Sequence, residues 1–315
     1  MDHPAEDPYS LRSVWVKYKQ GGAMWNATRN TIAVTGSRAG DALGVGYNSR
    51  WSYYREQRAM YLFLNGLVDE ALGTLHNGTG IPKRPTPSLL SRDRMAHGTR
   101  WESHALSLFR ALELGHDIYN SRLVKFPETG LVLSPQNPSD YGASPDAYIP
   151  KPMNSVVEIK CRYPNTALQG APSIQCYGGE QIDNKEGGFD SPIPVSHLCQ
   201  MILEMHCTGA TSAYYVCLGL ETATVSTPCL DPNRCYQYRL VVQKFLWDQA
   251  LWDRVVGPRL QCFAQAIRAQ PGTPFPRRMQ MGEAKKLKEQ IRTRMMKRSR
   301  PVSMYKGYTS MNKPV

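Results

Sequence analysis

Apolar residues recur at helical spacing over several long segments of the chain, and this pattern predicts amphipathic helices. The segments with this spacing are residues 10–19, 49–75, 89–114, 195–209 and 245–270. A further short helix is expected where Thr35 or Ser37 can act as the cap and Gly44 as the end. Gly209 supplies the same kind of stop signal for the fourth segment.

Between these helices, short apolar runs predict β-strands. The runs are residues 118–126, 130–134, 146–150, 155–161, 212–221 and 237–244. Residues 163–194 are rich in Gly, Asn, Asp and Pro and predict a long loop, a length that is typical of functional loops. The order of helices, antiparallel-looking strands, helix, two strands and helix predicts an α/β sandwich around one sheet.

The composition is that of an ordinary globular protein. The 315 residues are 41% hydrophobic and 20% charged, which suits one large domain or two small ones. No run of 18 apolar residues is present, and the first ten residues are acidic and polar, so we expect an intracellular protein that is neither membrane-spanning nor secreted. The eight cysteines form no CxxC pair, which predicts reduced thiols and no structural zinc.

The positive charge is concentrated at the C-terminus. Residues 277–315 carry about +10 of the net charge of +12, so the preceding part of the chain is nearly neutral. Such a tail is typical of a polyanion partner or of a localisation signal, which would be nuclear in a eukaryotic host. Leu287, Ile291 and Met295 recur every four residues, so the tail is either a helix with a narrow apolar stripe or a disordered segment. As a functional element, it would be an arm that holds duplex DNA near the neutral body.

Three charged residues stand out in the stretch SPDAYIPKPMNSVVEIKCRYP. Asp146 precedes the strand that carries Glu158 and Lys160, whose side chains share one face because strand side chains alternate. Two converging carboxylates form an oxygen site suited to Mg²⁺ or Mn²⁺, and a lysine beside it can hold or activate a water. This set of groups suits phosphodiester hydrolysis, whereas the alternative is a solvated strand with a surface ion pair.

Four motifs in the same order resemble the PD-(D/E)xK nucleases, in the branch of phage lambda exonuclease and the YqaJ viral recombinases. They are WNATRNTIAVTGSRAGDALG, AHGTRWESHALSLF, SPDAY with VVEIKC, and HLCQMILEM, and the resemblance covers about residues 22–250. The chain departs from the family pattern at Ala147, where glycine is frequent, and at Arg162, where proline is frequent.

The resemblance implies a restriction-endonuclease-like α/β core with a central mixed β-sheet flanked by helices. It also implies the metal site. Asp146 and Glu158 would bind Mg²⁺, or Mn²⁺ in its place, with the carbonyl of Ile159 as a further ligand and Glu102 completing the site.

The other roles implied by the resemblance concern the substrate. Lys160 would position or activate the attacking water, and Gln200 would help to hold that lysine and the scissile region. Arg29, Ser37 and Ser144 would form a pocket for a terminal 5′-phosphate, a task that suits a guanidinium and hydroxyl groups.

The domain organisation expected on this basis is an N-terminal extension (residues 1–21), a nuclease domain (22–272) and a basic tail (273–315). The implied function is a 5′-to-3′ exonuclease on linear double-stranded DNA ends, acting in viral recombination or genome processing with a single-strand annealing protein. Relatives occur as monomers and as rings. The alternatives are an endonuclease on DNA or RNA and a binding module without catalysis, which the presence of Asp146, Glu158 and Lys160 disfavours.

Overall fold

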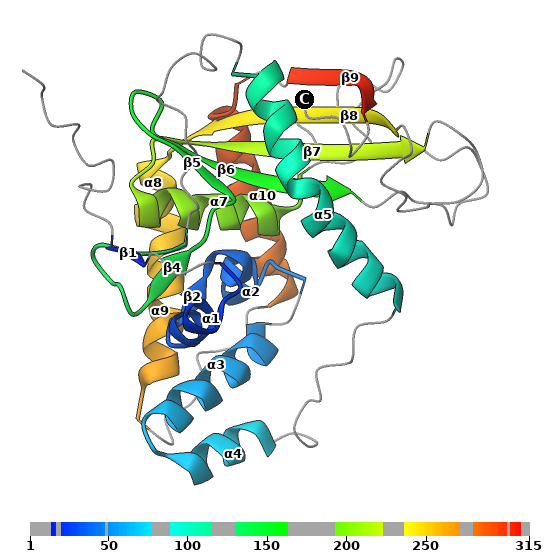
Figure 1. Ribbon diagram of the computed structural model, residues 1–315. Coiled ribbons are helices and arrows are strands. Elements are labelled where there is room, and N and C mark those ends of the chain that lie inside the picture. Colours follow the sequence, from blue (N-terminus) through cyan, green and yellow to red (C-terminus); the bar gives the residue numbers. More distant parts are fainter. Residues whose placement is uncertain are drawn as a thin grey trace, which may run out of the picture.

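The structure is a computed structural model and is shown as a ribbon in Figure 1. It describes residues 14–16, 20–47, 50–76, 89–114, 130–162, 193–222, 236–270, 280–300 and 303–309. The strand expected at residues 118–126 lies outside the described residues, and so does nearly all of the expected 163–194 loop.

A five-stranded mixed sheet forms the centre of the molecule (Figure 1). Its order is β5 (Ala147–Ile149), β6 (Ser155–Arg162), β7 (Ser212–Thr222), β8 (Tyr236–Leu246) and β9 (Ser303–Thr309). β6 and β7 are parallel, and the other neighbours are antiparallel. Helices cover both faces, so the expected α/β class with a mixed sheet flanked by helices is confirmed.

A second sheet of four short strands accompanies the first, so the expectation of a single sheet is wrong. Its order is β1 (Val14–Val16), β3 (Leu131–Leu133), β4 (Tyr141–Ala143) and β2 (Val34–Thr35). The helix expected at residues 10–19 is also wrong, because Val14–Val16 pairs antiparallel with β3. β-branched valines suit a strand, and in such a short segment the pairing with a partner strand determines the secondary structure.

The two faces of the five-stranded sheet contact different helices. Helix α5 (Leu89–Leu112) packs on the face that carries Val157 and Ile159 of β6. Helix α7 (Val195–Thr208) packs on the opposite face, where Val156 lies. Since side chains alternate along a strand, Glu158 and Lys160 also lie on the α7 side.

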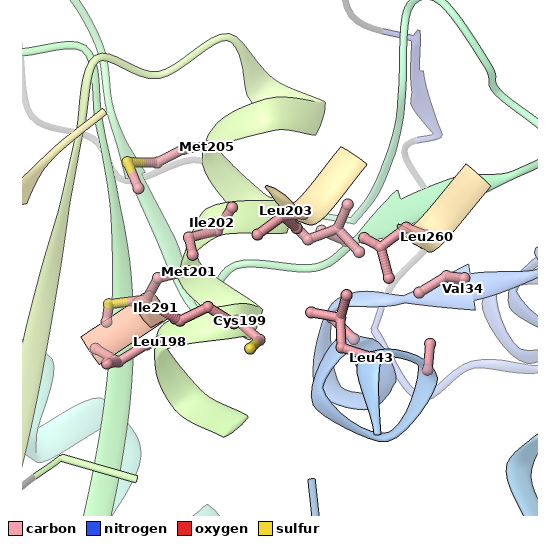
Figure 2. Close-up of a cluster of buried hydrophobic side chains, with 14 of the residues drawn as sticks. Val34, Leu43, Leu198, Cys199, Met201, Ile202, Leu203, Met205, Leu260 and Ile291 are labelled. Carbon is pink, nitrogen blue, oxygen red and sulfur yellow. The ribbon is translucent and has the colours of Figure 1, made fainter. Parts of the chain in front are cut away.

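Helix α7 lies between the sheet and the N-terminal helices (Figure 2). Its side chains Leu198 and Met201 lie near Ile291, whereas Leu203 lies toward Leu43 and Leu260. Both groups belong to one buried hydrophobic cluster. The helix therefore joins the sheet to the remainder of the fold.

The N-terminal part is helical, as its periodicity predicts. It consists of α1 (Ala23–Asn30), the 3₁₀ turn η1 (Gly36–Arg38), α2 (Ala39–Leu43), α3 (Arg50–Leu64) and α4 (Val68–His76). Gly44 ends α2 in the left-handed conformation, as expected. The long helix expected at 49–75 is two helices, because Gly66 adopts a φ of +78° between them.

The last long helix of the body begins later than expected. Residues Phe245 and Leu246 end β8, where Phe245 is fully buried and pairs with Ala213. The helical part comprises α8 (Gln249–Leu251), the π-helix η2 (Trp252–Val256) and α9 (Gly257–Arg268). Packing of Phe245 in the core therefore determines the boundary.

The described part of the basic C-terminal segment, residues 280–300 and 303–309, is built into the same core, which corrects its interpretation as an arm separate from the body. The helix that the apolar stripe predicts is α10 (Met281–Lys297), and Leu287, Ile291 and Met295 are all buried against α7 and β8. Arg294 makes a two-pronged ion pair with Asp248, at 2.8 and 2.9 Å. The following strand β9 pairs with β8.

Replacing Ile291 by alanine should lower the free energy of unfolding by about 2–5 kcal/mol, because its side chain is fully buried. Replacing the exposed Lys288 of the same helix by alanine should change the free energy of unfolding by less than about 0.5 kcal/mol. Urea denaturation followed by circular dichroism measures both. Equal small effects would show that α10 is a detachable tail.

Two expectations from composition can be compared with the described residues. None of the described helices combines the length and apolar character that crossing a membrane requires. The described cysteines are free thiols, namely Cys161, Cys199, Cys207, Cys217 and Cys262.

Candidate functional site

A pocket of about 240 Å³ lies where the five-stranded sheet, α7 and the N-terminal helices meet. Seven of the nine residues with predicted roles line it, and they come from five separate parts of the chain. They are Arg29, Ser37, Ser144, Asp146, Glu158, Lys160 and Gln200. The fold therefore brings the acidic groups, the lysine and the expected phosphate-binding groups into one cavity.

The hairpin of β5 and β6 positions the acidic groups. The Asp146 amide donates a hydrogen bond to the Val157 carbonyl at 3.1 Å. The Ile159 amide donates in turn to the Asp146 carboxylate at 2.6 Å. These bonds place the Asp146 carboxylate beside β6, next to the strand face that carries Glu158.

Lys160 and Glu158 form an ion pair at the wall of the pocket. Glu158 is fully buried, and its charge needs such a partner because unpaired buried charges are costly. Burial alone would lower the pKa of Lys160, but the neighbouring carboxylates of Glu158 and Asp146 raise it above its usual value. The ammonium group is therefore a fixed positive charge in the pocket.

Asp146 lies in an environment of like charge. Burial, and then the neighbouring Glu158, raises its pKa well above the usual range, although Lys160 acts in the opposite direction. A cation in the pocket would relieve this repulsion.

A further acidic residue, Glu204, belongs to this cluster and was missed by sequence reasoning. It is fully buried on α7 and accepts a hydrogen bond from the Gln200 amide at 2.9 Å. Burial, followed by the charges of Glu158 and Asp146, raises its pKa well above the usual value. The signal in the sequence is its spacing of four residues from Gln200, which places both side chains on one helix face.

The donor set fits a hard divalent cation. Glu158 and Glu204 each have one buried carboxyl oxygen that receives no hydrogen bond from the described residues. Lys160 donates a hydrogen bond to the other carboxyl oxygen of Glu158. Among the described residues, no group of three acidic, histidine or cysteine side chains surrounds a position for a metal ion. Mg²⁺ suits such a site because it keeps several waters and binds few carboxylates directly.

Two of the predicted metal-site groups do not line the pocket. Glu102 lies on α5 and is partly exposed. Burial is the main cause of the raised pKa values of Asp146 and Cys161, and the charge of Glu102 adds to both, which places it near the acidic cluster. Ile159 takes part through its amide, which holds Asp146, while its side chain packs on the α5 side of the sheet. Ligation by Glu102 and by the Ile159 carbonyl stays a prediction.

The opposite side of the pocket carries a chain of polar contacts. Arg29 on α1 donates a hydrogen bond to the Ser37 hydroxyl at 2.6 Å, and its guanidinium lies 4.7 Å from the centre of the Trp25 ring. The Trp25 indole donates in turn to the Ser144 hydroxyl at 3.1 Å. Trp25 therefore links the three groups expected to bind a phosphate, a role that its spacing of four residues from Arg29 could have indicated.

Two solved structures are similar to this chain. One is an alkaline exonuclease (LHK-Exo) from Laribacter hongkongensis, and the other is LHK-Exo in complex with dAMP. Each is 21% identical in sequence, with a TM-score of 0.44, and the similarity covers 85% of this chain and 97% of that chain. No curated protein matches the chain.

One protein family matches the chain over a long segment. The match runs over residues 24–211, which is more than half of the 315 residues. It includes all nine residues with predicted roles, together with Trp25 and Glu204. The chain therefore belongs to the family of the YqaJ-like viral recombinase domain.

Proposed function

We propose that the protein is a Mg²⁺-dependent deoxyribonuclease that hydrolyses phosphodiester bonds at the ends of linear duplex DNA, with Mn²⁺ as an alternative cation. The proposal rests on one pocket that both sets of groups share. It places Asp146, Glu158 and Lys160 within the same cavity as Arg29 and Ser37. Membership of the recombinase family supports a substrate of this class.

The residues divide the work of hydrolysis between them. Asp146 and Glu158 would hold the cation, which when bound neutralises charge on the scissile phosphate and lowers the pKa of a water. Lys160 supplies a fixed ammonium that orients the attacking water and stabilises negative charge in the transition state. Gln200 lines the same wall and helps to hold the reacting region.

Recognition of an end would come from the other side of the pocket. Arg29 is held over Trp25 and against Ser37, which limits the directions its guanidinium can take. A guanidinium with adjacent hydroxyls suits the terminal 5′-phosphate of a DNA strand. The proposal is therefore a 5′-to-3′ exonuclease whose product, a 3′ single strand, would serve an annealing protein in viral recombination or genome processing.

The direct test compares three DNA substrates with Mg²⁺: end-labelled linear duplex with a 5′-phosphate, the same duplex with a 5′-hydroxyl, and a closed circle. We expect rapid release of mononucleotides from the first, slower release from the second and no cleavage of the third. Cleavage of the circle at the rate of the linear duplex would indicate an endonuclease. Equal digestion of an RNA duplex would contradict the assignment to DNA.

Replacing Arg29 by alanine should slow digestion of 5′-phosphorylated ends far more than that of 5′-hydroxyl ends. A charge-assisted hydrogen bond to phosphate contributes about 1.5–3 kcal/mol, which corresponds to roughly tenfold to a hundredfold in rate. Single-turnover rates on the two substrates measure the difference. Arg29→Lys is the matched control, because it keeps the charge and loses the planar fork, so its defect should be intermediate. Equal slowing on both substrates would remove Arg29 from phosphate recognition.

A further inference from the structure

Glu204 touches the pocket groups without reaching the pocket itself. The lining includes Glu158, Lys160 and Gln200, whereas Glu204 lies behind them, fully buried on α7. It accepts a hydrogen bond from Gln200 at 2.9 Å, and the charge of Glu158, after burial, contributes to its raised pKa. Its effect on the reaction must therefore pass through these neighbours.

The contact with Glu204 determines which end of the Gln200 amide faces the pocket. Because the Gln200 nitrogen Nε2 donates to Glu204, the amide oxygen is left for other partners at the pocket that Gln200 lines. The pocket wall there carries the Lys160 ammonium, which needs acceptors. With the amide reversed, an N–H donor would replace this acceptor at the pocket that carries the ammonium.

A role in core packing alone does not account for a carboxyl group at this position. The buried neighbours of Glu204 along α7 include Leu203 and Met205, and an apolar side chain here would avoid the cost of burying a polar group. One of its carboxyl oxygens receives no hydrogen bond from the described residues and lies in the cluster with Glu158. The position is thus expensive for stability, which points to a contribution to the site.

We propose that Glu204 is a positioning residue for phosphodiester hydrolysis, which fixes the Gln200 amide through the hydrogen bond that it accepts from Nε2. This inference rests on the nuclease function proposed above. In this role Glu204 acts through the shape and hydrogen bonding of its side chain, and it does not bind the metal directly.

Two variants separate this role from the alternatives. Glu204→Gln keeps the length of the side chain, and its amide oxygen can accept from Gln200, but it removes the acid. Glu204→Asp keeps the acid and withdraws it from Gln200 by one methylene. We expect Glu204→Gln to turn over within about threefold of the wild type, and Glu204→Asp to be at least about tenfold slower, since small misplacements of reacting groups are costly.

The measurements are kcat and KM on 5′-phosphorylated linear duplex, together with the thermal midpoint of each variant. KM should change little in either, because Glu204 does not line the pocket. Thr208→Val is the matched control on α7: it removes a buried hydroxyl bonded to the Glu204 carbonyl at 2.7 Å, so the midpoint should fall while kcat stays. In a Gln200→Ala background, Glu204→Asp should cause little additional loss of kcat, which shows that the two residues act together.

Three results would overturn the proposal. Glu204→Gln as slow as Glu204→Asp would show that the acid itself is required. Normal kcat in both variants, with only a lower thermal midpoint, would make Glu204 a structural residue. A wild-type protein that hydrolyses no DNA would overturn the nuclease function together with this role, whereas the first two results leave the nuclease function intact.

Discussion

Replacing Glu158 by glutamine should abolish Mg²⁺-dependent cleavage of linear duplex DNA, with a loss of about a thousandfold or more. The side chain is fully buried at the pocket wall and would supply one of the charged oxygens that hold the cation. Glutamine has the same size but a much weaker affinity for a hard cation. Asp146→Asn should have the same effect, because it also removes a charged oxygen that would hold the cation. The local structure should persist, because the Ile159 amide can still donate to the asparagine oxygen.

The matched control for this result is Glu289→Gln on α10, an exposed glutamate of the same chain that lies outside the pocket. It should leave cleavage unchanged. The thermal midpoints of the Glu158 and Asp146 variants should stay close to that of the wild type, because each change also removes a repelling charge. Loss of cleavage together with loss of the folded state would make these carboxylates structural instead.

Replacing Lys160 by methionine should lower turnover by about a hundredfold to a thousandfold while Mn²⁺ binding persists. Methionine keeps the volume of the aliphatic stem and removes the ammonium that pairs with Glu158. The remaining carboxylates would then hold a cation with less competition, so the apparent affinity for Mn²⁺ should rise. Turnover and a Mn²⁺ titration, both on the same preparation, measure the two effects.

Lys160→Arg provides the control for charge, because a guanidinium restores the positive charge with a different geometry. Its turnover should lie between those of the wild type and Lys160→Met. A Lys160→Met variant with nearly normal turnover would remove the lysine from the reaction, and weakened Mn²⁺ binding would show that the lysine maintains the site itself.

The core of the candidate site was accessible from the sequence because it is local. Asp146, Glu158 and Lys160 lie on one hairpin, and the backbone bonds between β5 and β6 determine how they face each other. Alternation along β6 then determines which side chains share a face. A short segment of sequence therefore predicts most of the acidic cluster before any tertiary contact is known.

Glu204 shows where this reasoning stops. A glutamate on a helix is most often solvated, and its spacing from Gln200 is common on helix surfaces. Only the packing of α7 against β6 buries Glu204 beside Glu158. Trp25 is similar, because its link to Ser144 joins residues that are 119 positions apart.

The C-terminal segment shows how composition can mislead. Its charge run suggested a solvated arm, since Lys and Arg dominate residues 277–315. The apolar stripe of Leu287, Ile291 and Met295 predicted a helix, and the helix is confirmed. Whether that stripe meets solvent or a core depends on the surface that α7 and β8 present to it, which no local pattern contains.

The sequence by itself determined the periodic helices, most of the strands and the hairpin that carries Asp146, Glu158 and Lys160, because each depends on neighbours in the chain. The tertiary structure alone decided that Val14–Val16 is a strand, that the basic segment joins the core and that Arg29 lines the same pocket as the acidic residues. Those outcomes depend on contacts between distant segments. Their free energy comes from surfaces and strand partners that exist only once the chain has folded.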